Sequence, residues 1–520
     1  MKKARQVFLR IFLVIILIVP VHLCFSQEIK LKETPDELAQ KLIHNPAFVD
    51  NANGENFCWH AKVGLDRFVE NYDLTKDSKW LDAGIKYYDF LISKMETDPD
   101  GYKGWIGVYG YDNRYWQDAL VGDAILFEGI LNFSVLVLED KYLMRKYRRK
   151  ATAYVELAKR DFIEKWDKRG CWVEDGPYGT YIGFNKYLKS DDLKNWIVAP
   201  GVERSGVSHP FNKQMDVGAV CLRLLRITGD KFYRERAEKI YFTVKSHFQY
   251  FDDHYCWNYF EPLYPGDVDL EKKTTLHGVW VHMWRSGYQA GEVEKIAEAY
   301  HYGIVFDEQD IKRIINTNLH VMWNKDTINP KFINSNGLGA DGDTIGVAAF
   351  KQAYGHSNVI KNGGELWTGL IDFDQRIRDL YAVQFKNGKK SKEWLRYKNT
   401  VLVNPPGFKR KFVKGEVTLP KVSFTESKEL SLATVLPHVI QKDKKSIIIC
   451  QSWIPGNLSI DLYAISGEKE VNIYQGKIKE GMFMITWDGK DPTNKKLYKG
   501  DYKIRWTIGT GYREFPVSIK

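Results

Sequence analysis

The chain has 520 residues, which is enough for a large domain and a smaller one. Aromatic residues make up 14% of it, and the formal net charge is +10. Lysine and arginine are spread along the sequence, whereas a nucleic-acid-binding protein gathers them in a basic stripe or a reading motif. We therefore expect no nucleic-acid partner. The positive charge would suit an anionic substrate or serve only solubility.

Residues 1–26 have the pattern of a secretory signal peptide. Basic residues precede the apolar run 11–19, which is too short to span a bilayer, and small residues at Cys24 and Ser26 form a cleavage site. Lipid attachment at Cys24 is the alternative, but the bulky Leu23 disfavours it. We expect a protein exported to the periplasm, the cell surface or the medium, with no transmembrane segment.

From about Asn56 to Tyr397 the chain has the period of successive amphipathic helices, within a predicted domain of residues 27–415. Apolar residues recur at helical spacing in the segments 77–95, 117–138, 141–166, 214–227 and 231–248. Asp77, Asp140 and Asp230 precede three of these segments in a repeated motif, where each is expected to cap its helix. Long loops would join the helical hairpins on one face, and such loops commonly have a function: 101–115, 170–210, 252–275 and 329–343.

The pattern changes to short alternating strands after Lys421. The predicted strands are 446–450, 458–464, 471–475, 482–487 and 502–508. This spacing predicts a β-sandwich over residues 421–520. The segment from Trp487 to Asp491, followed by Tyr502, resembles the Ig-like C-terminal modules of secreted bacterial enzymes. The resemblance implies an accessory or sorting domain.

Several kinds of site have no support in the sequence. Of the 6 cysteines, all but Cys24 lie beyond the leader, and their odd number and wide spacing argue against a disulfide framework, although one or two bridges could form. No cysteine or histidine cluster has the spacing of a zinc site, and there is no P-loop, GxSxG or HExxH motif. We expect neither a metal nor a cofactor.

Aromatic and titratable side chains crowd together between Tyr255 and Trp284. Trp257 and Tyr259 could stack on sugar rings, while Glu261 and His277 could bind sugars or move protons. The alternative is that the rings are packing residues and Glu261 is a solvated loop charge.

Two other segments place polar groups where helices begin. In Ser208–Gln214, His209 and Asn212 could face a cleft at a helix N-terminus, or Asn212 could cap the helix. Ahead of the segment 117–138, Trp116 could stack on a sugar, and Asp118 or Asp123 could act as an acid or as an N-cap.

Three elements in this order, 208–214, 255–262 and 276–280, resemble uronate-cleaving polysaccharide lyases of the alginate and glucuronan type. The resemblance implies a mainly α fold: an (α/α) toroid of helical hairpins, followed here by the small β-sandwich. It also implies a secreted enzyme that cleaves an anionic polysaccharide by β-elimination, with possible cell-surface association through the tail.

The resemblance implies a role for each candidate residue. Asn212, assisted by Arg204 or Arg285, would neutralise the uronate carboxylate, because the C5 proton is otherwise only weakly acidic. His277 or His209 would be the base, and Tyr259 the acid or the combined acid and base. The remaining candidates would bind neighbouring sugars: Trp116, Asp118, Trp257, Glu261 and Tyr288.

Two other functions compete with elimination. A toroid glycoside hydrolase would use paired carboxylates, and the chain offers Asp118, Asp123, Asp175 and Glu261. A non-catalytic glycan-binding protein would keep the aromatic rings without a set of titratable groups. Absorbance separates elimination from hydrolysis, because only elimination creates a double bond conjugated to a carboxylate.

Overall fold

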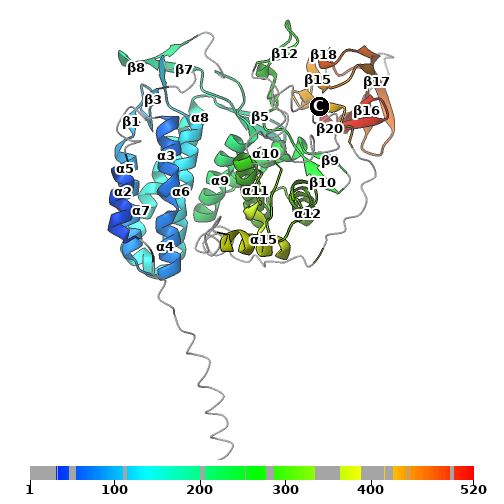
Figure 1. Cartoon of the computed structure of the whole chain (residues 1–520). Helices are drawn as coiled ribbons and strands as arrows, with labels where there is room; N and C mark the ends of the chain where they lie inside the picture. Colours follow the sequence, from blue (N-terminus) through cyan, green and yellow to red (C-terminus); the bar gives the residue numbers. More distant parts are fainter. Residues whose placement is uncertain are drawn as a thin grey trace, which may run out of the picture.

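The structure is a computed structural model. It describes residues 33–45, 54–108, 114–199, 205–251, 253–276, 286–333, 364–387, 426–441, 444–491 and 497–520, with the single residues 31 and 415. Figure 1 shows a first group of helices side by side, a second group next to it, and the C-terminal strands above the second group. The predicted leader, 1–26, lies outside the described residues.

The first group of helices spans the N-terminal third of the chain. It contains α2 (Pro35–Ile43), α3 (Glu55–Leu65), α4 (Arg67–Thr75), α5 (Lys79–Ser93), α6 (Leu120–Glu139) and α7 (Lys141–Ala158), which continues through the π-helix η2 (Lys159–Glu164) into α8 (Lys165–Lys168). The second group contains α9 (Phe211–Thr228), α10 (Lys231–Ser246), α11 (Ser286–His301), α12 (Glu308–Asn316), the π-helix η4 (Thr317–Met322), the 3-10 helix η5 (Thr368–Leu370) and α15 (Gln375–Lys386). The predicted mainly α region is confirmed.

The repeated aspartate motif marks helix starts as predicted. Asp140 accepts hydrogen bonds from the backbone N–H groups of the first turn of α7, and Asp230 does the same for α10. Asp77 lies one residue before the N-cap Ser78 of α5 and accepts a hydrogen bond from the Lys79 N–H instead.

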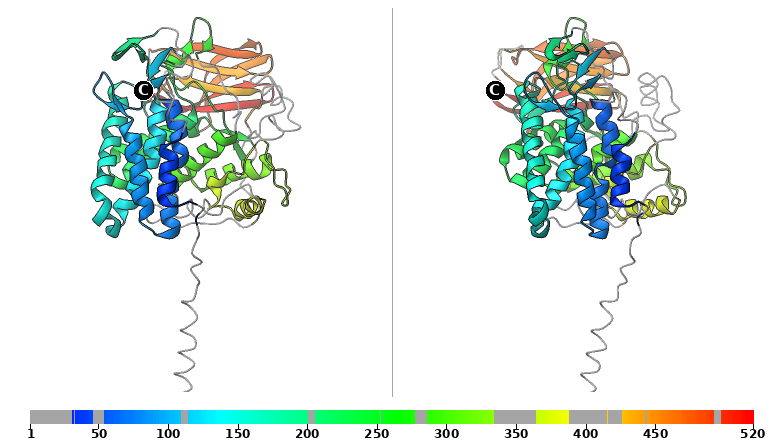
Figure 2. Two further views of the ribbon diagram at one scale, coloured as in Figure 1. Left: turned by 60° about the vertical axis from the view of Figure 1, so that its left-hand side comes forward. Right: turned by 90° about the vertical axis from the view of Figure 1, so that its left-hand side faces the viewer.

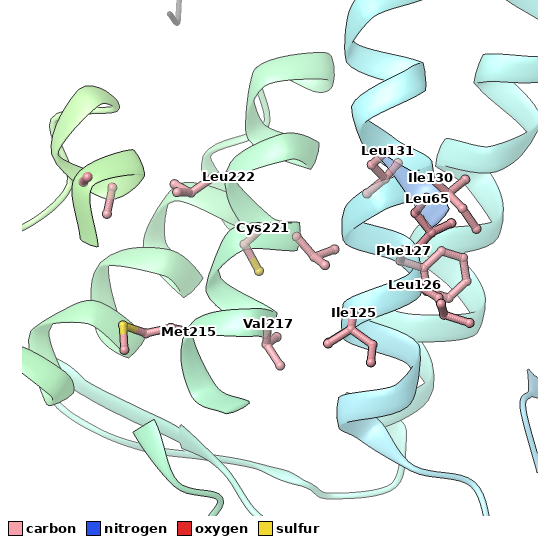
Figure 3. Close-up of a cluster of buried hydrophobic side chains, with 14 of the residues drawn as sticks. Leu65, Ile125, Leu126, Phe127, Ile130, Leu131, Met215, Val217, Cys221 and Leu222 are labelled. Atoms are coloured by element: carbon pink, nitrogen blue, oxygen red, sulfur yellow. The ribbon is translucent and has the colours of Figure 1, made fainter. Parts of the chain in front are cut away.

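Helix α6 lies at the centre of the helical region, between α3 and α9. A Cβ atom at Gly122 would come within 2.9 Å of Cys58 Sγ, and one at Gly129 within 2.7 Å of the Leu65 Cβ, so glycine permits the close approach of α3. Figure 3 shows Ile125 of α6 beside Val217 of α9 in the same apolar core. Contrary to the sequence-based expectation, α6 is long and apolar enough to span a membrane, but 89% of its most apolar window is buried inside the protein.

Most of the predicted long loops are folded into short hairpins. The strands pair as β1 (Glu96–Thr97) with β2 (Lys103–Gly104), β5 (Trp172–Asp175) with β6 (Tyr178–Tyr181), β9 (Gln249–Phe251) with β10 (His254–Cys256), and β11 (Val268–Asp269) with β12 (Thr274–Thr275). A four-stranded sheet has the order β3 (Gly107–Val108), β4 (Tyr115–Gln117), β7 (Lys186–Lys189) and β8 (Asp192–Val198). Pairing between these strands gives hydrogen bonds to backbone N–H and C=O groups that would lack them in an irregular loop.

The C-terminal region contains two sheets. One has the order β13 (Leu430–Leu436), β15 (Ser446–Ser452) and β18 (Gly481–Trp487). The other has the order β14 (Val439–Ile440), β20 (Gly511–Ile519), β19 (Gly500–Ile508), β16 (Gly456–Ala464) and β17 (Lys469–Ile478). Ile448 of the first sheet and Trp506 of the second belong to one apolar core. The predicted β-rich tail is therefore confirmed, and β13, β14 and β20 add to the five predicted strands.

The two sheets are packed against hairpins of the helical region rather than separated from it. Asn258 Nδ2 donates to the Ser431 carbonyl at 2.7 Å, and the Val439 N–H donates to Asp175 Oδ2 at 2.6 Å. Figure 2 shows the C-terminal strands and the short hairpins at the same end of the helices. This end of the helical region is therefore covered by the C-terminal residues.

Candidate functional site

A pocket of about 410 Å³ lies among helices α3, α9 and α11. Its lining residues are Trp59 and Lys62 of α3, Asn212 and Asp216 of α9, and Tyr288, Gly291 and Lys295 of α11. On each helix these residues are three or four positions apart, so each set lies on one face. The pocket is thus built from rigid helices.

Gly291 leaves one wall of the pocket open. A Cβ atom built at Gly291 meets no atom of the described residues within 4 Å. At Gly218 of α9, by contrast, a Cβ atom would come within 2.9 Å of the Tyr241 ring. Gly218 therefore serves helix packing, whereas Gly291 borders empty space.

The two lysines of the pocket differ in their partners. Lys295 Nζ lies 2.8 Å from Asp216 Oδ1 and 3.5 Å from Glu128 Oε2, and all three side chains are largely buried. Lys62 Nζ lies 5.6 Å from the centroid of the Trp59 ring, and no carboxylate in the described parts of the chain pairs with it. Lys62 is therefore the cation that remains available to an anionic ligand.

A buried acid lies next to the pocket on α11. Glu292 Oε2 accepts a hydrogen bond of 2.7 Å from Trp257 Nε1, and both side chains are wholly buried. Burial raises the pKa of Glu292 to about 8, and the negative charge of Asp216 acts in the same direction. Glu292 is therefore largely protonated at neutral pH.

Asn212 lies in the first turn of α9. The N-cap of this helix is Pro210, so Asn212 does not cap it. Its side chain is only 8% exposed, and Asn212 Oδ1 accepts no hydrogen bond from the described residues. A buried amide oxygen without a hydrogen-bond donor is costly unless a ligand or water donates to it.

A second, smaller cavity of about 30 Å³ is lined by Glu55 and His209, among other residues. Glu55 Oε1 accepts hydrogen bonds from Lys213 Nζ at 2.9 Å and from Trp59 Nε1 at 3.2 Å. Burial opposes ionisation of Glu55, but the charge and hydrogen bond of Lys213 lower its pKa below the usual value. Glu55 thus lines the smaller cavity as a carboxylate and holds the Trp59 ring of the larger pocket through a hydrogen bond.

Tyr259 and Trp116 lie outside the lining of the pocket. The Tyr259 ring packs on the Tyr288 ring, with centroids 5.1 Å apart, and is 5% exposed. Trp116 lies in β4, half-buried, and pairs with Val108 and Leu188 of the neighbouring strands. Of the two tyrosines considered from the sequence, Tyr288 is the one that reaches the pocket.

Asp118 and Asp123 belong to a buried ion cluster. Lys165 Nζ lies 2.6 Å from Asp118 and 2.7 Å from Asp123, and Arg169 lies 2.8 Å from Asp118. Burial opposes the charge of Asp118, but Lys165 and Arg169 hold its pKa at about 2. Burial and the charge of Asp118 raise the pKa of Asp123 to about 7. Neither residue caps α6, whose N-cap is Ala119.

Glu261 and Trp257 are also placed in the interior. Glu261 is 1% exposed, and Glu261 Oε2 lies 3.8 Å from His247 Nε2 at the boundary with the C-terminal sheets. Burial raises the pKa of Glu261 to about 7. The 0% exposure of Trp257 leaves no ring face open to a sugar. Asp175, the remaining hydrolase candidate, binds the Val439 backbone.

His277, Arg204 and Arg285 lie outside the described residues. Within the described ranges, no group of three or more histidine, cysteine, aspartate or glutamate side chains is arranged to hold a metal ion. The cysteines described there are all buried, and none of them forms a disulfide.

The sequence reasoning missed Trp59, Lys62, Asp216 and Lys295. The signal for Asp216 and Lys295 was present, because charged residues interrupt the apolar faces of helices that are otherwise buried. Trp59 and Lys62 had a weaker signal, since α3 was not among the predicted helical segments. Their spacing of three residues becomes informative only when 55–65 is known to be a helix.

No family model and no curated protein matches the chain. Among solved structures, a cellobiose 2-epimerase from Spirochaeta thermophila is similar over 63% of this chain and 73% of its own, with 12% identity and a TM-score of 0.34. An inactive variant of an α-1,6-mannanase from Salegentibacter, in complex with α-1,6-mannotetrose, is similar over 71% of this chain and 98% of its own, with 13% identity and a TM-score of 0.32. Likenesses this distant assign neither a family nor a reaction.

Proposed function

We propose that the chain is an exported (α/α) toroid enzyme that cleaves a uronic-acid-containing polysaccharide by β-elimination in the pocket among α3, α9 and α11. One observation carries the proposal: the Asn212 amide, whose Nδ2 can donate to a carboxylate, shares this pocket with Lys62 and Tyr288. Asp216 is the single carboxylate among the described lining residues, and it is already paired with Lys295. The lining thus favours binding of an anion over paired-carboxylate chemistry.

The chemistry of elimination assigns a role to each of these groups. The Asn212 amide binds the carboxylate of the reacting uronate through its Nδ2 donor, and this carboxylate delocalises the charge that develops when the C5–H bond breaks. The electron pair forms the C4–C5 double bond, the C4–O4 bond breaks, and the leaving oxygen takes up a proton. Tyr288 is the lining group that can transfer these protons, in place of Tyr259, which lies behind it. His277 remains a proposed base.

Hydrolysis is the second candidate, and one observation favours it. Glu292 is a protonated acid with a pKa of about 8, and the neighbouring Asp216 is paired with the Lys295 cation. A protonated acid beside a carboxylate is the pair that acid-assisted glycoside hydrolysis requires. The complete burial of Glu292 stands against this role, because the acid must reach the glycosidic oxygen.

The test uses the purified full chain with alginate, β-1,4-glucuronan and a neutral glucan of the same linkage. Elimination raises both the ultraviolet absorbance of unsaturated uronates and the number of reducing ends. Hydrolysis raises reducing ends alone, and a non-catalytic glycan-binding protein raises neither. Absence of an absorbance change with every uronate polymer, while reducing ends appear, would replace elimination by hydrolysis.

A further inference from the structure

We infer that Trp59 and Lys62 of α3 form a subsite that binds a carboxylated sugar ring beside the reacting one. Stacking on the indole and charge pairing with the ammonium would act together on the same sugar. The inference rests on the proposed function in one respect, namely that the pocket binds a polysaccharide. It is independent of whether the bond is cleaved by elimination or by hydrolysis.

The Trp59 ring is fixed before any ligand arrives. Its Nε1 donates to Glu55 Oε1 at 3.2 Å, and the same oxygen accepts a hydrogen bond of 2.9 Å from Lys213 Nζ. Trp59 is half-buried and lines the pocket, unlike Trp257 and Trp367, which are fully buried in the core. A ring held in place loses little conformational freedom on binding, so its contact area contributes fully to affinity.

Lys62 supplies the charge for the subsite. It follows Trp59 by three residues on the same face of α3, and its Nζ lies 5.6 Å from the centre of the Trp59 ring. A carboxylate can pair with Lys62 without breaking an existing ion pair in the described parts of the protein. Binding to Lys295 would instead disrupt its contacts with Asp216 and Glu128.

Trp59 and Lys62 together determine whether the subsite prefers neutral or acidic sugars. The C–H face of any pyranose can stack on an indole, so Trp59 alone would bind neutral and acidic sugars alike. An ammonium 5.6 Å from the centre of the same ring favours a sugar whose ring also has a carboxylate. Lys62 therefore determines specificity for acidic sugars, and Trp59 provides affinity for both kinds.

The experiment compares two tetrasaccharides that differ only at C6: cellotetraose and β-1,4-linked tetraglucuronate. Binding of each is measured by titration calorimetry with the unmodified full chain and with Lys62→Met, Trp59→Phe and Trp59→Ala. Lys94→Met is the matched control, because Lys94 also lies over an aromatic ring, that of Phe90, but is the exposed C-cap residue of α5, outside the pocket. Circular dichroism establishes that each variant is folded.

We expect Lys62→Met to weaken binding of tetraglucuronate about tenfold, as for loss of one charge pair, and to leave cellotetraose binding nearly unchanged. Trp59→Ala should weaken binding of both sugars, and Trp59→Phe should restore most of it. If Lys62→Met matches Lys94→Met for both sugars, the subsite is wrong, even if the unmodified chain cleaves uronate polymers.

The proposed reaction can fail separately from the subsite. If the unmodified chain binds tetraglucuronate in a Lys62-dependent way but neither new absorbance nor new reducing ends appear, the subsite stands and the enzymatic function does not. If the unmodified chain binds neither tetrasaccharide, the subsite is overturned, and the assay with alginate and glucuronan decides the proposed reaction by itself.

Discussion

Trp257 donates its indole N–H to Glu292 at 2.7 Å, and the two side chains are wholly buried. Glu292 lies between the pocket-lining residues Gly291 and Lys295 in the sequence of α11, so the pair supports the wall of the pocket from behind. Trp257 is therefore a positioning residue for α11 rather than a ring on which a sugar stacks.

The protonated state of Glu292 predicts a pH dependence of stability. Its pKa rises from the usual 4.5 to about 8 on folding, so the folded protein binds a proton that the unfolded chain has released. This contribution is complete below pH 4.5 and is lost as the pH rises towards 8, by roughly 1.4 kcal/mol per pH unit. Glu292→Gln should remove it, as measured by urea unfolding between pH 5 and 8.

The control for this measurement is Glu235→Gln, which changes an exposed glutamate on α10. Other buried acids with raised pKa values, Asp98 and Glu426 among them, contribute to the profile of every variant. The informative quantity is therefore the difference between each variant and the unmodified chain. If that difference does not change with pH for Glu292→Gln, the side chain is ionised in the folded protein.

The helices and strands could be predicted largely from local patterns. Asp140 and Asp230 cap their helices because capping depends on the backbone of the next two or three residues. The alternating strands of the tail were recognisable for a similar reason. Strand β20 was not predicted, although it pairs with both β19 and β14 in the five-stranded sheet.

The candidate site was predictable only in part. Whether a candidate side chain is buried depends on segments that are far from it in the sequence. Asn212 was identified from its place at a helix start, which is local information. Glu261 looks like a loop carboxylate in the sequence, yet its neighbour Asn258 donates to Ser431, 173 residues later in the chain. Asp118 likewise has Lys165, 47 residues away, as its partner. Pairings of this kind leave no periodic signal.

The open wall at Gly291 predicts opposite effects for two substitutions. Gly291→Ala should stabilise the protein by about 0.5 to 1 kcal/mol, because alanine favours the helix and its Cβ meets no atom within 4 Å among the residues that the structure describes. Gly291→Phe should fold normally but fill the pocket and abolish oligosaccharide binding. Urea unfolding and titration calorimetry measure the two effects. Retention of full binding and activity by Gly291→Phe would place the functional site elsewhere.

Gly129→Ala is the matched control for this pair of variants. It adds the same methyl group to a helix, but the new Cβ would come within 2.7 Å of the Leu65 Cβ. The crowding should outweigh the gain in helix propensity, so this variant is expected to be less stable than the unmodified chain. A stabilising effect at both glycines would mean that α3 can move away from α6 at little cost.

The ion cluster around Lys165 predicts a large loss of stability when its cation is removed. Lys165→Met leaves Asp118 and Asp123 buried without their shared partner, and should lower the free energy of unfolding by about 3 to 5 kcal/mol. Lys159→Met, which removes a surface pair with Glu156 on the same stretch of helix, should cost less than about 1 kcal/mol. Equal losses would show that the buried cluster is not a stabilising element.

The contacts of the C-terminal sheets change the expected result of truncation. Removing residues 421–520 from an accessory module would leave the helical region intact, but here it would uncover Glu261, Asn258 and the ring of Tyr178. We expect the fragment 28–415 to remain helical by circular dichroism, to melt at a lower temperature and to bind a dye specific for apolar surfaces. A fragment as stable as the full chain would restore the view of residues 421–520 as an independent domain.

The ranking of four pocket variants separates the two proposed reactions. For elimination, Asn212→Ala and Tyr288→Phe should each lower kcat by about two to four orders of magnitude, since they remove the carboxylate neutraliser and the proton-transfer group. Asp216→Asn and Glu292→Gln should then be milder. For hydrolysis the order is reversed, because Asp216 and Glu292 would be the reacting pair and the phenol of Tyr288 would be dispensable. Rates are measured with the uronate polymer that gives the largest signal. Near-normal activity of Tyr288→Phe together with an inactive Glu292→Gln would rule out elimination by these residues.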